Sequence, residues 1–140
     1  MTLENRAKKD IIYADLSGKI IGILLDVYNQ LGYGHPEKTY QKAIELALKE
    51  AQIQFSGQLY VPVIYGDRVV GKNFFDFLID GKVVLEIKKG NYFVKSHIDQ
   101  VYKYLVAKNL QLGILAYFAP RTVHLKRVVN LKGPYIRKSP

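Results

Sequence analysis

The order in which helical and strand-like patterns alternate constrains the fold of this sequence more than any other feature. Two segments with apolar residues at helical spacing come first, followed by three segments rich in β-branched and aromatic residues, a third helical segment and two further strand-like segments. The predicted helices cover residues 16–31, 36–51 and 97–109, and the predicted strands cover 60–65, 69–79, 83–88, 112–118 and 123–129. This order predicts an α/β fold in which a mixed β-sheet of about five strands is flanked by helices.

Three local signals set the expected boundaries. Pro36 fits the first position of the second helix, because the fixed backbone of proline suits a helix start. Ser96, followed by Asp99, is the expected N-cap of the third helix. The last strand alternates polar and apolar residues, so we expect it at a half-exposed edge of the sheet.

Chain length and composition restrict the class of protein. The 140 residues, 49% of them hydrophobic, suit one compact domain, and we expect its core over about 16–130 with flexible stretches at 1–10 and 131–140. The absence of cysteine excludes disulfides, thiolate zinc sites and cysteine nucleophiles. The most apolar stretch is broken by Asp26 and is too short to span a membrane, and a signal-peptide core is absent from the first residues. We therefore expect a cytoplasmic protein that does not enter a membrane.

Positive charge is concentrated in the C-terminal part of the chain. Residues 1–80 carry nine Lys or Arg against ten Asp or Glu, whereas residues 81–140 carry twelve against two. Such a surface would attract phosphate backbones by releasing counterions, a salt-sensitive effect that does not depend on sequence. Nucleic acid is the leading class of partner on this ground, with a merely soluble basic protein as the alternative.

Two neighbouring predicted strands carry acids in unusual places. Asp76 interrupts a run that is apolar on both faces, and strand alternation puts Glu86 and Lys88 on one face of the next strand. A two-residue turn at Asp80-Gly81 would put Asp76 and Glu86 on opposite faces of the sheet. A three-residue hairpin loop over residues 79–81 would instead place Asp76 diagonal to Glu86, about 7–8 Å away along the sheet. Each charge alone has a structural explanation, since Asp76 could cap a bulge and Glu86 with Lys88 could form a solvated stripe.

Taken together, these acids indicate a metal site. Two carboxylates on a mostly apolar face repel each other and lose hydration, unless a cation or a proton compensates. Oxygen ligands suit Mg²⁺ or Mn²⁺, and a nearby lysine can orient water and stabilise charge that develops on a phosphate. Lys88 would have that role.

Four segments together resemble the PD-(D/E)XK nuclease superfamily, and its GxxExxY family in particular. Residues 76–88 read D-x9-E-x-K, and residues 34–40 read G-x-x-E-x-x-Y directly after a helix that ends in LGYG. Residues 97–104 resemble the H-x-x-Q and Q-x-x-x-Y helix of such proteins, and HLKRVVN at 124–130 is similar to their last strand. The resemblance covers about residues 16–130 and implies a restriction-endonuclease-like core.

The resemblance implies a role for each matching residue. Asp76, Glu86 and the backbone carbonyl of Ile87 would be metal ligands, and Lys88 would lie beside the attacking water. Glu37 would be an auxiliary acid and a candidate further ligand, although an acid in the first turn of a helix is also favourable without any function. Gln100 and Tyr104 would face the site and contact a phosphate or a base. Lysines and arginines expected to contact phosphate are Lys89, Lys95, Arg121, Lys126 and Arg127.

Two other motif residues have structural interpretations. Core packing is the favoured role of Tyr40, with orientation of Glu37 as the alternative. His97, at a helix start, is expected to be a surface residue rather than a ligand.

The resulting hypothesis is a nuclease that uses Mg²⁺ or Mn²⁺ and acts on nucleic acid, with DNA favoured over RNA and a homodimer as an open alternative to a monomer. A catalytically silent nucleic-acid-binding module with the same fold is the first rival. An interaction protein whose basic surface meets an acidic partner is the second.

Overall fold

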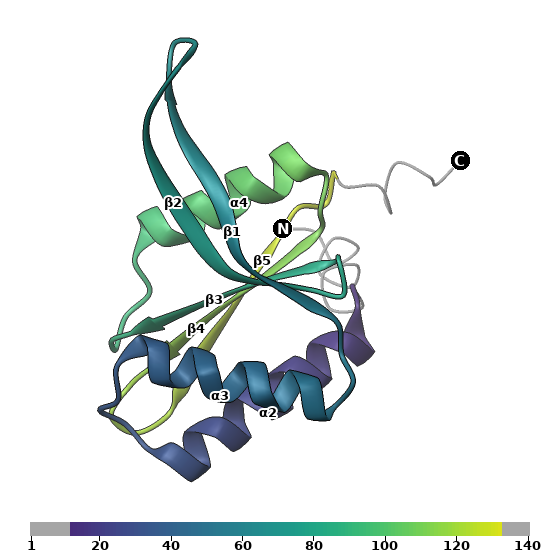
Figure 1. The fold of residues 1–140 in the computed structure, drawn as a ribbon, viewed down its shortest axis with the longest axis vertical. Helices are drawn as coiled ribbons and strands as arrows, with labels where there is room; N and C mark the ends of the chain where they lie inside the picture. Colours follow the sequence, from purple (N-terminus) through teal and green to yellow (C-terminus); the bar gives the residue numbers. More distant parts are fainter. Residues whose placement is uncertain (1–11, 133–140) are drawn as a thin grey trace.

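The computed structural model describes residues 12–132 and contains a five-stranded sheet with helices on both faces (Figure 1). In chain order the elements are α2 (Ala14–Leu31), α3 (Glu37–Glu50), β1 (Phe55–Tyr65), β2 (Arg68–Ile79), β3 (Val83–Lys89), α4 (Lys95–Lys108), β4 (Leu112–Phe118) and β5 (Val123–Val129). The strands lie in the order β1-β2-β3-β4-β5, with β3 and β4 parallel and the other neighbours antiparallel. The predicted mixed α/β fold is confirmed.

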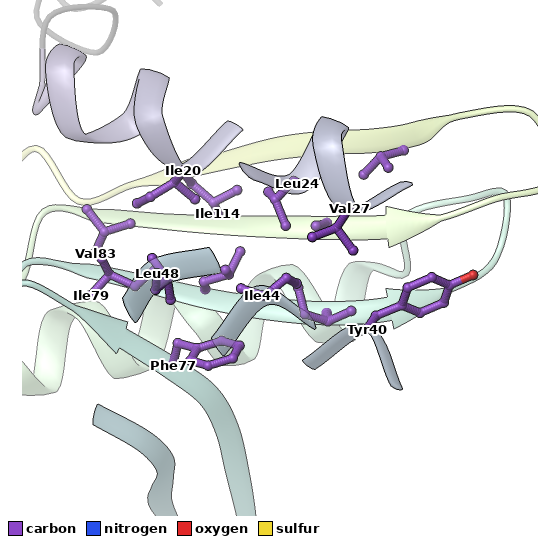
Figure 2. Packing of buried hydrophobic residues seen from close by; sticks show 14 of the residues in the cluster. Ile20, Leu24, Val27, Tyr40, Ile44, Leu48, Phe77, Ile79, Val83 and Ile114 are labelled. Carbon is purple, nitrogen blue, oxygen red and sulfur yellow. The ribbon is translucent and has the colours of Figure 1, made fainter. Parts of the chain in front are cut away.

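Two hydrophobic clusters hold the helices on the sheet. On one face, apolar side chains of α2 and α3 pack against β2, β3 and β4, as Figure 2 shows for Leu24, Ile44 and Ile114. On the other face, Val101 and Leu105 of α4 pack against β3 and β4. Strand β4, which pairs with β3 and β5, is buried over its whole length, because helices cover both of its faces.

Several predicted boundaries need correction. Strand β1 begins five residues before the predicted start, and α2 begins at Ala14. Pro36 is the N-cap of α3 rather than its first residue. The prediction of Ser96 as an N-cap is wrong, because α4 begins at Lys95 and the carbonyl of Val94 accepts the bonds from the N–H groups of His97 and Ile98. The bounds predicted for β4 and β5, and the edge position of β5, are confirmed.

The β2–β3 hairpin has a three-residue loop, but its position differs from the prediction. Ile79 pairs with Val83, so the loop consists of residues 80–82, one residue later than expected. Asp80 and Gly81 both have positive φ, at 53° and 65°, and the N–H of Lys82 donates to the carbonyl of Ile79. The shift matters for the site, because it places Asp76 directly opposite Glu86 instead of diagonal to it.

The first two strands continue beyond the sheet as a two-stranded arm. Strand β2 pairs with β3 only over Phe77–Ile79, whereas its pairing with β1 extends to Tyr65 and Arg68 (Figure 1). Phe75 and Phe77 belong to different hydrophobic clusters although they are two residues apart, so β2 changes course at Asp76. We call residues 59–75 the β1–β2 arm.

The flexible ends that the sequence predicts, at residues 1–10 and 131–140, lie outside the described residues except for 131 and 132. Within residues 12–132, no helix is both long and apolar enough to cross a membrane.

Candidate active site

The candidate active site lies where β2 separates from β3. At that point, side chains replace the regular backbone hydrogen bonds between the two strands. The N–H of Ile87 donates to Oδ2 of Asp76 at 2.7 Å, and the N–H of Asp76 donates to Oε1 of Glu86 at 3.1 Å. The two carboxylates therefore face each other and cap the split between the strands, so the expected convergence of Asp76 and Glu86 has a direct geometric basis.

Helix α3 supplies a further residue, Gln41, that sequence reasoning missed. Its Nε2 donates to Oδ1 of Asp76 at 2.6 Å, so both carboxylate oxygens of Asp76 are held by hydrogen bonds. Gln41 lies four residues after Glu37, which places both side chains on the same face of α3. The four-residue spacing from Glu37 is visible in the sequence. It does not show that Gln41 contacts Asp76, because that contact depends on how α3 packs over the sheet.

Burial perturbs both acids. Glu86 is only 7% exposed, and burial together with the nearby Asp76 raises its pKa to about 9. Burial also raises the pKa of Asp76. Lys88 has its Nζ 3.8 Å from Oε2 of Glu86, which opposes the rise without cancelling it. Without a cation, the pair therefore retains a proton at neutral pH.

The donor set fits a hard divalent cation. Asp76 and Glu86 offer carboxylate oxygens at one point, and a bound cation would offset the burial that raises the pKa of both acids. Glu37 does not complete a three-acid cluster, since among residues 12–132 no group of three or more Asp, Glu or His side chains is arranged to hold a metal ion. Its Oε2 instead accepts a hydrogen bond from the N–H of Lys89 at 3.2 Å. Glu37 thus contacts the end of β3, next to Lys88.

The G-x-x-E-x-x-Y segment holds the start of α3 in place. The hydroxyl of Tyr40 donates to the carbonyl of Gly32 at 2.6 Å and accepts from the N–H of His35 at 3.3 Å. Tyr40 is fully buried, with its ring 4.2 Å from that of Phe118, and Gly34 has a φ of 108° that favours glycine. The favoured interpretation of Tyr40 as a core residue is therefore confirmed. Its hydrogen bonds also fix the loop that precedes Glu37.

His97 is half-buried near the start of α4, so part of it lies at the surface. Its Nδ1 is hydrogen-bonded to the hydroxyl of Tyr117, which lies beside Lys88 in the parallel β3–β4 pair. Burial lowers the pKa of His97, and the positive charge of Lys88 lowers it further. A neutral imidazole therefore lies on the α4 side of the site.

Gln100 and Tyr104 line a groove whose walls do not include Asp76, Glu86 or Lys88. They are one turn apart on α4 and line a cavity of about 590 Å³ between α4 and the β1–β2 arm. The ring of Tyr104 is 5.1 Å from that of Phe75, the residue before Asp76. Tyr104 thus contacts β2 one residue before Asp76, on the face of the sheet that α4 covers.

The expected phosphate contacts differ in exposure. Lys89, Lys95, Arg121 and Lys126 are exposed. Arg127, by contrast, is half-buried. Its Nη2 donates a hydrogen bond to the buried hydroxyl of Ser17 on α2, and its Nη1 is buried without a hydrogen-bond partner among residues 12–132. Arg127 therefore joins α2 to β5, and we do not retain it as a phosphate contact.

Comparisons with known proteins agree with the fold. The sequence profile described as the PD-(D/E)XK nuclease superfamily matches residues 14–128. Among solved structures, the crystal structure of SSO0001 is similar with a TM-score of 0.51 and 21% sequence identity. That match covers 66% of this chain and 49% of SSO0001, so this chain corresponds to about half the length of that protein. A comparison with curated proteins gives no significant match.

Two substitutions of Asp76 separate its structural role from its charge. Asp76→Asn keeps an oxygen that can accept from Ile87, and its amide nitrogen can donate to Gln41 once the Gln41 amide turns over. The change also removes the charge that helps to raise the pKa of Glu86, so stability without metal should equal or exceed that of the wild type. Asp76→Ala leaves the N–H of Ile87 without its acceptor and should lower the free energy of unfolding by about 1–3 kcal/mol. Urea unfolding in EDTA measures both. Equal loss in the two variants would contradict a repulsive carboxylate pair.

Glu86 should make stability without metal depend on pH. Its pKa is raised from 4.5 to about 9 in the folded state, so between these values the folded protein holds a proton that the unfolded chain has lost. Its contribution to the free energy of unfolding therefore falls as pH rises. In EDTA, the Tm of Glu86→Gln relative to the wild-type Tm should rise as pH increases across this range, whereas the Tm of the exposed variant Glu50→Gln should not. A constant difference would refute the raised pKa.

Proposed function

The chain belongs to the PD-(D/E)XK nuclease superfamily, and we propose that it is a metal-dependent nuclease that hydrolyses phosphodiester bonds in DNA. The observation that carries this proposal is the pair of carboxylates, half-buried Asp76 and buried Glu86, held face to face beside Lys88. A catalytic arrangement of this kind accounts for two acids whose repulsion would otherwise only reduce stability. Within the superfamily we assign the chain to the GxxExxY family, supported by the contacts of Gly34, Glu37 and Tyr40.

Mg²⁺ or Mn²⁺ is the proposed cofactor, with Asp76, Glu86 and the carbonyl of Ile87 as its ligands. When bound, such an ion polarises a phosphate oxygen and lowers the pKa of a water molecule. Its positive charge would also replace the proton that the acid pair retains, because a cation favours both carboxylates in their ionised form.

The surrounding side chains have distinct proposed roles. Lys88 is partly exposed, so its ammonium group can hold the attacking water or stabilise charge that develops on the phosphate. Gln41 orients the carboxylate of Asp76 through its short hydrogen bond and is a positioning residue. Glu37, on α3, is an auxiliary acid that lies against the end of β3. Gln100 and Tyr104 would contact the substrate from the groove that they line.

The charge distribution supports nucleic acid as the partner. Twelve Lys or Arg against two acids over residues 81–140 give this part of the chain a strong positive charge, and Lys89, Lys95, Arg121 and Lys126 are exposed on it. These residues would contact phosphates and position the strand without reading its sequence.

A catalytically silent nucleic-acid-binding module is the second candidate. It is favoured by the hydrogen bonds of Asp76 to Ile87 and Gln41, since a protein without activity would keep this acid as a cap for the separated strands. Turnover distinguishes the two candidates.

The decisive assay incubates the protein with supercoiled plasmid and with labelled single-stranded DNA in Mn²⁺, Mg²⁺ or EDTA. We expect metal-dependent cleavage that Asp76→Asn and Glu86→Gln each reduce by at least about 100-fold, because each loses a charge that binds the metal. Matched controls are Asp80→Asn, in the exposed loop after β2, and Glu50→Gln, at the exposed end of α3.

The outcomes separate the candidates cleanly. Cleavage that persists in both site variants comes from a contaminant and contradicts the site assignment. DNA binding without cleavage in any metal establishes the silent module instead.

A further inference from the structure

A hydrogen bond on the α4 side of the candidate active site joins His97 to Tyr117. Nδ1 of His97, in the first turn of α4, is bonded to the hydroxyl of Tyr117 on β4. Tyr117 pairs with Lys88 in the parallel β3–β4 ladder, so both side chains point to the face of the sheet that α4 covers. Burial lowers the pKa of His97, the charge of Lys88 lowers it further, and the charge of Glu37 opposes the change. The imidazole is therefore within electrostatic reach of two residues of the site.

The side chain of Tyr117 is firmly held. It is only 2% exposed, and its ring makes an edge-to-face contact with Phe93 at a centroid distance of 4.9 Å. Its hydroxyl also accepts a hydrogen bond from the N–H of Val94, the residue before α4, at 3.4 Å. The same hydroxyl thus holds both the start of α4 and the imidazole of His97.

These contacts determine which imidazole nitrogen carries the proton. A tyrosine hydroxyl has one proton to donate, and among residues 12–132 its acceptor is Nδ1 of His97. Nδ1 is then unprotonated, and the proton of the neutral ring is on Nε2. A doubly protonated ring would leave the buried hydroxyl proton of Tyr117 without an acceptor, which is unfavourable. The bond therefore favours a neutral His97 with an N–H at Nε2.

This N–H is available to a ligand. Among residues 12–132, Nε2 of His97 has no hydrogen-bond partner, and unlike Nη1 of Arg127 it is not sealed from solvent. A free N–H beside the ammonium group of Lys88 suits an anionic oxygen, because a hydrogen bond to a charged acceptor is stronger than one to a neutral acceptor. A phosphate bound at Lys88 would supply such an oxygen.

We propose that His97 contacts the substrate as a neutral hydrogen-bond donor, with its Nε2–H bonded to a phosphate oxygen beside Lys88. Tyr117 is the positioning residue that holds the ring in this tautomer. The inference rests on the proposed nuclease function and adds a substrate contact to it. The contact differs from those of the lysines, because a neutral donor binds a phosphate without releasing a counterion.

Two substitutions of His97 separate the roles of its nitrogens. The side-chain amide of glutamine can reach the position of Nε2, whereas the shorter asparagine reaches only the position of Nδ1. His97→Gln therefore keeps a donor for the substrate, and His97→Asn keeps only a partner for Tyr117. The control is His124→Asn, which changes a half-buried histidine on the other side of Tyr117, in β5.

Fluorescence anisotropy in EDTA measures the affinity for labelled DNA, as a single strand and as its duplex, without cleavage. For the form that the wild type binds more tightly, we expect His97→Asn to lose about tenfold in affinity and His97→Gln less than about threefold. His124→Asn should bind like the wild type. Because the lost contact is neutral, His97→Asn should keep the wild-type slope of log K against log salt concentration.

NMR of the ¹⁵N-labelled imidazoles reads the tautomer without any substrate. At pH 7 in EDTA, we expect His97 to carry its proton on Nε2 and none on Nδ1. In Tyr117→Phe the pKa of His97 should rise, because the hydroxyl that favours an unprotonated Nδ1 is gone while Lys88 and Glu37 remain.

A proton on Nδ1 of His97 in the wild type would overturn the inference, as would wild-type affinity in His97→Asn or no binding of either DNA form. A loss in His97→Gln that equals or exceeds the loss in His97→Asn would show that His97 only supports Tyr117. A salt slope reduced by about 0.7–0.9 in His97→Asn would identify a charged contact instead of a neutral one. Failure of the wild type to cleave any DNA in Mn²⁺ would refute the nuclease function and leave these binding and NMR comparisons valid.

Discussion

The hydrogen bonds between Asp76, Glu86 and Ile87 are the constraint on which the rest of the site depends. They occur where β2 leaves β3, and they satisfy backbone groups that the separating strands can no longer pair with each other. The same bonds hold two acids together in a buried place, which raises the pKa of both. The pairing of Asp76 with Glu86 thus satisfies the backbone where the strands separate, and it lies where the β1–β2 arm begins. It also creates a site at which a bound cation would be stabilising.

Helices on opposite faces of the sheet complete the surroundings of the acid pair. Helix α3 contributes Gln41 to Asp76 and Glu37 to the end of β3, and the buried Tyr40 fixes its start. Helix α4 contributes His97 near Lys88, through Tyr117, and Tyr104 beside Phe75. Each helix is positioned by its own hydrophobic cluster, so the geometry of the site is set by packing on both faces.

Periodicity predicted the elements and the identity of the acid pair, because both depend on local pattern. An acid in an apolar strand and the alternation of Glu86 with Lys88 are visible in the sequence, and an odd-numbered hairpin loop correctly put the acids on one face. The loop position was wrong by one residue, since the left-handed backbone at Asp80 gives no clear sequence signal. Gln41 was missed because its role depends on the contact between α3 and the sheet, which local pattern does not determine.

The most direct test of the account is the position of a bound metal. Crystals grown with Mn²⁺ and measured for anomalous scattering should show one strong peak about 2–2.5 Å from carboxylate oxygens of Asp76 and Glu86. The same peak should be missing in Glu86→Gln crystals. A wild-type peak elsewhere, or none between these two side chains at saturating Mn²⁺, would contradict the claim that the acid pair is a metal site.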